Sequence, residues 1–488
     1  MNRREFSKRM VLLGAGLQAG STLGQVNEPR EPPGEFYEEP VKKLPVRRFD
    51  VVVAGAGTAG VFAALAAARQ GAKTLLIERK GYPGGTVVEG GTALHSFFNL
   101  WKAFPGVPKR QVVKGIPQEI VERLVKAGGT SGHAEMLLGY NSDSICTAID
   151  TEIYKLVAFE MLVEAGVSCA VNTLLAGAIM ESSRVKGVIA ESRAGREAIF
   201  ANSFVDCTAY GDLAAFAGAK YTEPNDYPVV NSMGVGGINL DRYAEFLQSH
   251  NGVDQLAKGL RSGREGQIVR LQCNGKGLPA EFKTAAAKIG LSMTITTVQD
   301  DYFMFVKMGL KMPVSPTNRD AVSVAELELR KRQAKAIALF RKYLPGCEKA
   351  FIARTSPSLN IRRARVVACD YDITRSDVLD GVHFADDVFA YGFHDNAPRL
   401  KIKGGGTYGI PYRALRVVGV ENLLAAGMMI TSNYDAHMST RNTVCCMGQG
   451  QAAGTAAALC AAKKCDAREL PYRDLRDALL TANVVIES

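Results

Sequence analysis

One stretch near the start of the chain constrains the fold more than any other. Residues 49–54 form a short apolar run, and the turn Gly55-Ala56-Gly57-Thr58-Ala59-Gly60 follows at once. An alanine-rich helical segment spans 61–70, and a second apolar run, 72–77, ends in Glu78. A strand, a glycine turn, a helix, a second strand and an acid in this order predict a Rossmann-like α/β unit with a parallel sheet.

The spacing of this turn is that of a dinucleotide site. Gly55 makes the tight turn, Gly57 lets the backbone approach a pyrophosphate, and Gly60 lets the helix pack close to the strand. The N-terminus of the helix, at Thr58 and Ala59, offers unpaired N–H groups to the phosphates. Glu78 can accept hydrogen bonds from ribose hydroxyls.

Two further stretches favour FAD over NAD. Gly84, Gly85 and Thr86 follow the acid and Arg79, an arrangement that resembles two-dinucleotide-binding flavoproteins. Far along the chain, an apolar strand from 420 ends in Gly427, and a small-residue helix over 446–458 carries Gly450 and Gln451. In such flavoproteins the N-terminus of this helix faces the flavin ring. Leu175, at the end of a strand expected over 171–175, is a candidate backbone partner for the adenine.

With both ends of the chain in agreement, a family resemblance follows. The chain resembles the bacterial FAD-dependent oxidoreductase family with a split FAD domain, and more distantly the fumarate reductase flavoproteins and the glutathione-reductase-like superfamily. The stretches that carry the resemblance are 114–124, 204–212, an arginine-rich strand at 361–365, Ile410-Pro411-Tyr412-Arg413-Ala414-Leu415, 439–441 and 450–454. The chain departs from the family at Ala209-Tyr210, where Gly-Asp is usual.

The length of 488 residues exceeds what one core ordinarily supports. We expect an FAD-binding domain in two parts, 45–221 and 405–470, and an inserted mixed α+β substrate domain, 222–404. An export signal, 1–30, and a linker, 31–44, would precede them, and a C-terminal segment, 471–488, would follow.

The first residues have the features of an export signal. Arg3 and Arg4 precede Phe6 and Lys8, and a modest apolar stretch follows. This pattern resembles a twin-arginine export signal, which implies a periplasmic or cell-envelope location. A disordered basic tail is the alternative.

Composition excludes several classes of protein. The net charge is +10, but no long basic run interleaves with aromatic residues, so we expect no nucleic-acid partner. The ten cysteines show neither C-x-x-C nor metal-ligand spacing, so no metal site is expected. No later stretch is apolar for long enough to span a membrane.

The predicted catalytic groups lie near the flavin-facing helix. A loop at 428–442 contains His437, a candidate for proton transfer, and Arg441, a candidate for binding a substrate carboxylate or supporting the reduced flavin. His95, just past the glycine pair, is a candidate proton-transfer group or flavin anchor. Arg362 and Arg365 alternate on the expected strand, so they point either at an anionic ligand or into core salt bridges.

These features predict an FAD-dependent dehydrogenase or reductase. A hydride would pass between flavin N5 and a small polar organic substrate, and the positive net charge leaves an anionic substrate open. Two alternatives stay open at this point, a flavin monooxygenase and a non-catalytic electron-transfer subunit. The electron acceptor or donor is unknown.

Overall fold

The computed structural model describes residues 37–90, 94, 98–100, 108–138, 145–396 and 400–487. The predicted export signal and residues 31–36 of the predicted linker lie outside these residues, as does His95. Within the described part, no helix is both long and apolar enough to cross a bilayer.

A five-stranded parallel sheet forms the centre of the predicted cofactor domain. Its strands run in the order β24-β12-β2-β3-β8, and every neighbouring pair is parallel. The α/β class with a Rossmann-like sheet is therefore confirmed. The bounds are β2 Val51–Ala54, β3 Thr74–Ile77, β8 Ser168–Ala170, β12 Ser203–Asp206 and β24 Leu423–Ala425.

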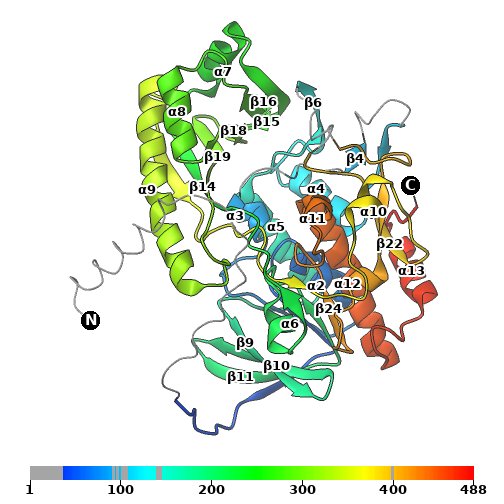
Figure 1. The fold of residues 1–488 in the computed structure, drawn as a ribbon. Coiled ribbons are helices and arrows are strands. Elements are labelled where there is room, and N and C mark those ends of the chain that lie inside the picture. The colour runs from blue at the N-terminus through cyan, green and yellow to red at the C-terminus, as the bar shows by residue number, and fades with distance from the viewer. Residues whose placement is uncertain are drawn as a thin grey trace.

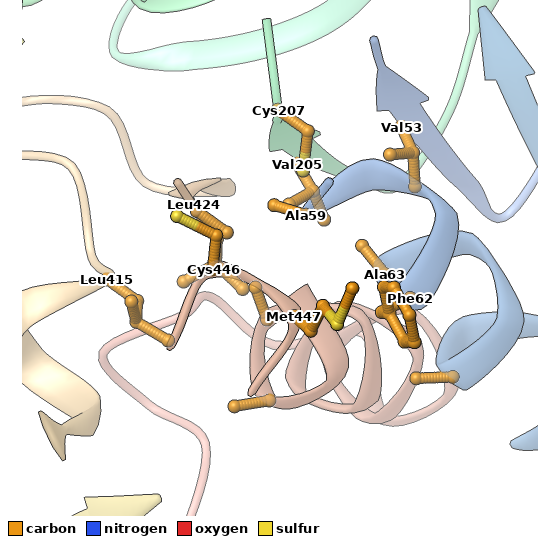
Figure 2. Close-up of a cluster of buried hydrophobic side chains, with 14 of the residues drawn as sticks. Val53, Ala59, Phe62, Ala63, Val205, Cys207, Leu415, Leu424, Cys446 and Met447 are labelled. Carbon is orange, nitrogen blue, oxygen red and sulfur yellow. The ribbon is translucent and has the colours of Figure 1, made fainter. Parts of the chain in front are cut away.

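Two helices from opposite ends of the chain pack together against this sheet. Helix α2, Gly60–Arg69, follows the glycine turn, and helix α12, Thr443–Lys463, contains the predicted small-residue helix 446–458 and extends beyond it at both ends. Figure 2 shows Ala59, Ala63 and Phe62 beside Met447 of α12, with Val53 and Val205 of the sheet close by. Small side chains on both helices allow this close approach.

Other helices and a small sheet belong to the same half of the molecule as the parallel sheet. The helices are α3 Thr86–Gly90, α4 Ile116–Lys126, α5 Thr151–Glu164, α6 Asp212–Phe216, α10 Arg375–Leu379, α11 Tyr434–Thr440 and α13 Tyr472–Thr481. The antiparallel strands β9 Leu174–Glu181, β10 Arg184–Ser192 and β11 Gly195–Phe200 form the predicted hairpin region, and β1 Val46–Arg48 joins its edge. In Figure 1 this sheet lies at one end of the molecule, beside α6.

A second core belongs to the predicted insert, and its buried residues run from Val229 to Leu359. One sheet has the order β17-β19-β14-β20 and the other β18-β16-β15-β6-β7. Figure 1 shows the long helix α9 alongside α8 on the outer side of this half. The bounds are β14 Val229–Gly236, α7 Leu240–Ser249, β15 Val253–Arg261, β16 Arg264–Cys273, α8 Ala280–Lys288, β17 Leu291–Ser292, β18 Thr294–Thr296, β19 Tyr302–Leu310, α9 Arg319–Tyr343 and β20 Phe351–Thr355.

The two halves exchange segments. Strands β6 Ala134–Leu138 and β7 Ile145–Cys146 come from the predicted cofactor domain, yet β6 pairs with β15 of the insert. In the other direction, β21 Val366–Val367 and β22 Asp387–Tyr391 of the predicted insert add buried residues to the first core, where β22 pairs with β23 Tyr408–Pro411. The halves are thus joined by several segments of chain, and a site between them would be built from both.

Three expectations about local structure are wrong. Residues 361–365 form an irregular segment, and only Val366–Val367 beyond them is a strand. The expected loop at 428–442 contains helix α11, which Asn433 caps by accepting a hydrogen bond from the Ala436 N–H group at 3.0 Å. Leu175 is the second residue of β9 and does not end a strand.

Candidate functional site

A cavity of about 490 Å³ runs from the carboxyl ends of the parallel strands to the inserted half. One end is lined by the glycine turn, Glu78 and the start of β9, and the middle by Gly427 and the beginning of α12. The far end is lined by side chains from both halves, namely Tyr227, Lys307, Asn360, Arg362, Asp395 and Arg441. Ligands of open α/β sheets bind at this edge.

The three glycines of the turn have different tasks. A Cβ at Gly55, whose φ is +92°, would lie 2.6 Å from the Cys207 carbonyl oxygen, and one at Gly60 would lie 1.7 Å from the Gly55 oxygen. Both glycines are therefore required by the packing of the protein itself. A Cβ at Gly57 would meet only the Cys207 oxygen, at 4.0 Å, and Gly57 lines the cavity. The free space at Gly57 is space for a ligand.

The glycine turn also presents backbone N–H groups that no side chain caps. Helix α2 begins after Ala59, which makes no side-chain cap, so the first N–H groups of the helix have no such partner. Thr58 and Ala59 line the cavity beside them. This is the arrangement that binds a diphosphate through backbone N–H groups and the helix dipole.

Glu78 ties the second strand to the turn. Its carboxylate accepts the Ala56 N–H at 2.8 Å and the Lys80 N–H at 2.9 Å, and it lines the cavity. Arg79 and Leu175 line the same end. The residues predicted for the ribose and adenine are thus brought together.

The glycine pair packs directly on the turn. Gly84 donates its N–H to the Ala56 carbonyl at 2.8 Å, and a Cβ on Gly85 would lie 2.9 Å from the Gly57 Cα. Gly85 and Thr86 line the cavity, whereas Gly84, at φ +112°, faces Val88 and Tyr154.

The N-terminus of α12 reaches the middle of the cavity. Asn442, Thr443 and Cys446 line it together with Gly427, and the Asn442 side chain makes no cap to the helix. The free N–H groups of a 21-residue helix therefore face the cavity, where they favour negative charge. Sequence reasoning had found the helix but not these three residues; an asparagine before a helix is the N-cap signal that marks its start.

Two predicted cofactor residues on α12 lie elsewhere. A Cβ on Gly450 would lie 2.1 Å from the Ala59 oxygen, so Gly450 serves the contact between the two helices. Gln451 accepts the Ile116 N–H at 3.0 Å and lines a second cavity between α2, α4 and α13. Both residues hold α12 in place without lining the first cavity.

Arginines and an acid form a network at the far end. Arg441 forms an ion pair with Asp395 and donates to the Tyr227 hydroxyl at 3.1 Å. The guanidinium carbons of Arg441 and Arg362 lie 5.1 and 6.0 Å from the centroid of the Tyr227 ring. Arg365, in contrast, forms an ion pair with Asp212 at 2.7 Å, so the two arginines predicted to share a strand face have different surroundings.

His437 does not line the cavity. It is buried, and its Nε2 donates to the Arg362 carbonyl at 3.2 Å. Burial lowers the pKa of His437 well below its usual range, and the Arg441 and Arg363 cations lower it further. The neutral imidazole therefore holds the backbone of Arg362, and its role in proton transfer stays a prediction.

Lys307, from strand β19, was missed by sequence reasoning. It lines the cavity, and burial lowers its pKa to about 7, with Arg362 and Arg441 acting in the same direction. The available signal was a lysine within the otherwise apolar run Tyr302–Leu310. Tyr227 and Asn360 carry no local motif at all, whereas Asp395 follows His394 in a pair that the sequence suggests could face the cleft.

The fold and the cavity define a flavoprotein of the Rossmann type. The sequence profile of the family described as "FAD dependent oxidoreductase" matches residues 50–479, and the chain belongs to this family. Its cofactor is FAD, and the protein is an oxidoreductase. A search of curated proteins finds no significant match.

The structural comparison finds matches at low identity and low TM-score. A geranylgeranyl bacteriochlorophyll reductase-like protein from Thermoplasma acidophilum is 13% identical, over 90% of this chain and 84% of that one, with a TM-score of 0.48. A p-nitrophenol 4-monooxygenase from Pseudomonas putida is 11% identical, over 90% and 89%, with a TM-score of 0.44. A myxobacterial chondrochloren halogenase is 13% identical, over 88% and 78%, with a TM-score of 0.45.

The residues present fit FAD. The open space at Gly57 and the uncapped start of α2 suit the diphosphate, Glu78 suits the ribose, and the uncapped start of α12 suits the electron-rich side of a flavin ring. We assign Gly57, Thr58, Ala59, Glu78, Gly85, Thr86 and Gly427 as the residues that would hold it.

Proposed function

We propose that this FAD-dependent oxidoreductase is a dehydrogenase or reductase of a small polar organic substrate. The observation that carries the proposal is the continuation of the cavity past the start of α12. There Tyr227, Lys307 and Arg362 line it together with residues of the first half. A cavity that would hold only the cofactor would not need polar side chains from a second domain.

The protein would contribute binding and electrostatics to the reaction. Bound FAD supplies the redox chemistry, the transfer of a hydride at ring atom N5. The uncapped N-terminus of α12 would stabilise negative charge that develops beside it. Arg441, fixed by Asp395 and Tyr227, would orient a polar substrate group.

An anaerobic spectrum of the purified holoprotein tests this proposal. Sugars, hydroxy acids and amino acids are added one at a time, and the flavin absorbance is followed. Bleaching by one compound is expected, and Arg441→Met should slow it while Arg473→Met, an exposed arginine on α13, should not. If NADPH bleaches the flavin only when an aromatic compound is present, and oxygen then yields a hydroxylated product, the protein is a monooxygenase. Bleaching by an electron-transfer partner alone would identify a non-catalytic subunit.

We further propose that the full chain is exported through a twin-arginine signal. Arg3 and Arg4 with Phe6 support this proposal. Fractionation of cells that express the full chain should place it in the periplasm or cell envelope. The double variant Arg3→Lys/Arg4→Lys should accumulate in the cytoplasm, and equal export of both proteins would contradict the proposal.

A further inference from the structure

The far end of the cavity holds more positive than negative charge. Lys307, Arg362 and Arg441 line it, and Asp395 is the carboxylate that acts on Lys307. Because Asp395 forms an ion pair with Arg441, that pair is close to neutral. Asp395 acts on both Lys307 and Arg362, but within the described residues neither cation forms an ion pair of its own.

Arg362 is held in place but not neutralised. Its backbone carbonyl accepts the His437 Nε2–H, and its guanidinium lies over the Tyr227 ring. No ion pair joins it to a residue in the described part of the chain. Burial lowers the pKa of Arg362, and the neighbouring Arg441 lowers it further. Tyr227 and Asp395 act in the opposite direction, but a guanidinium stays protonated, and Arg362 lines the cavity, where an anion would offset its charge.

Lys307 is in the same situation. Its Nζ lies 5.8 Å from the centroid of the Phe305 ring, and within the described ranges it has neither a hydrogen bond nor an ion pair. The charged groups that act on it are Arg362, Arg441, Asp395 and, from strand β16, Arg270. Three of the four are cations, so protonated Lys307 is destabilised unless an anion lies beside it.

The diphosphate of FAD is not a suitable partner for these two cations. The glycine turn and the start of α2 that suit it contact Cys207 and Glu78, whereas Arg362 and Lys307 contact Tyr227, His437 and Phe305. The start of α12 follows Arg441, which contacts Tyr227, and it lines the same cavity. An anion at Arg362 and Lys307 would therefore belong to the substrate.

We propose that Arg362 and Lys307 together bind a carboxylate of the substrate, so that the substrate is an organic acid. This inference rests on the proposed function and names its substrate class. A guanidinium matches the planar carboxylate with two parallel donors, and an ammonium adds a third donor from a separate strand. Tyr227 and the Arg441–Asp395 pair form the neighbouring wall.

Binding of small carboxylates to the FAD-loaded protein tests the proposal without turnover. Acetate, oxalate, succinate and benzoate are titrated, and binding is followed by the flavin difference spectrum and by calorimetry. We expect saturable binding of at least one of them and none of the matching amides. Arg362→Met and Lys307→Met should each weaken it by about tenfold, the size usual for a lost hydrogen bond to a charged group. Lys331→Met, on the exposed face of α9, and Arg473→Met are the matched controls.

The pH dependence separates Lys307 from a purely structural residue. Since its pKa is lowered to about 7, the ammonium is present below pH 7 and is lost above it. Carboxylate affinity should therefore fall as the pH rises through about 7. The fall should be absent in Lys307→Met, and Lys307→Arg should retain affinity at pH 9.

Other outcomes would overturn the inference. The first is equal carboxylate affinity in both variants and in the parent protein. The second is an affinity of the parent protein for inorganic phosphate equal to its affinity for carboxylates. The third is loss of FAD from Arg362→Met while carboxylate binding stays intact. Circular dichroism and the FAD content check that each variant is folded, and Arg362→Lys replaces Arg362→Met if it is not. If a neutral compound bleaches the flavin and no carboxylate binds, the substrate class is wrong but the oxidoreductase proposal stands. If carboxylates bind and no compound bleaches the flavin, the proposed function fails instead.

Discussion

A Cβ on Gly450 would lie 2.1 Å from the carbonyl oxygen of Ala59, and four residues further on, a Cβ on Gly454 would lie 2.0 Å from that of Ala63. The backbones of α12 and α2 are therefore in direct contact over a full turn. We expect Gly450→Ala to lower the free energy of unfolding by about 1–3 kcal/mol, because the added methyl must force the helices apart. Urea unfolding followed by circular dichroism measures this change. An unchanged midpoint would show that the helices can separate without cost.

Gly57 and Gly60 should respond differently to the same substitution. A Cβ at Gly60 would lie 1.7 Å from the Gly55 oxygen, whereas at Gly57 its nearest contact is 4.0 Å away. Gly60→Ala should therefore destabilise the protein, by about 1–3 kcal/mol or more. Gly57→Ala should leave the unfolding of the apoprotein nearly unchanged and weaken FAD binding, since its methyl group would occupy the cofactor's space. Apoprotein unfolding and FAD titration by fluorescence quenching distinguish the two. Full FAD affinity in Gly57→Ala would contradict the assigned cofactor position.

Ala209 adopts a backbone conformation that suits glycine. Its φ is +68°, in the left-handed region, and it lies where the family resemblance places a glycine. A Cβ in this region costs about 1–2 kcal/mol. Ala209→Gly should thus raise the free energy of unfolding, by somewhat less than this amount because glycine also adds entropy to the unfolded chain. Thermal unfolding of the variant measures the gain; a lower melting temperature would show that the Ala209 methyl group makes compensating contacts.

The cofactor end of the site was predictable because its signals are local. Gly55 to Gly60 and Glu78 lie within one strand–helix–strand unit, where the spacing of residues reports the geometry directly. Helix α12 was predictable for a similar reason, since a long run of small residues is itself the signal of close packing.

The substrate end was not predictable in the same way. Lys307, Tyr227 and Asp395 come from separate segments, and only the docking of the inserted half on the first brings them together. His437 shows the opposite case. A histidine near the flavin-facing helix suggested catalysis, but α11 turns its ring onto the Arg362 carbonyl. Side-chain direction depends on helix phase, and the sequence had suggested a loop there.

His133 should make stability depend on pH in the mildly acidic range. It bonds Thr147 Oγ1 and Gln118 Oε1, both at 2.8 Å, and burial lowers its pKa to about 4. As the pH falls, the unfolded chain therefore binds a proton at His133 near pH 6.5, whereas the folded protein does not bind it until about pH 4. The stability contributed by neutral His133 is complete above pH 6.5 and is lost as the pH falls towards 4.

His133→Gln tests this dependence, because glutamine does not titrate and can keep polar contacts. Between pH 6.5 and 4 the parent protein should lose about 1.4 kcal/mol per pH unit more than the variant. Urea midpoints measured at half-unit steps give the difference. His250→Gln, at an exposed site, is the control and should follow the parent protein. Parallel curves for parent and His133→Gln would show that His133 titrates alike in the folded and unfolded states.

Asp395 should weaken carboxylate binding even though it orients Arg441. It forms an ion pair with Arg441, and its charge raises the pKa of Lys307 against the larger effect of burial. Asp395→Asn removes one negative charge from a site proposed to bind an anion, so affinity for a small carboxylate should rise by about fivefold at pH 6. The same change should move the midpoint of the pH dependence below 7, because Lys307 loses a charge that favours its protonated form. Asp320→Asn, an exposed acid at the start of α9, is the control and should alter neither quantity. A loss of affinity in Asp395→Asn would mean that holding Arg441 in position outweighs the charge, and the Arg441–Asp395 pair would then be part of the binding site itself.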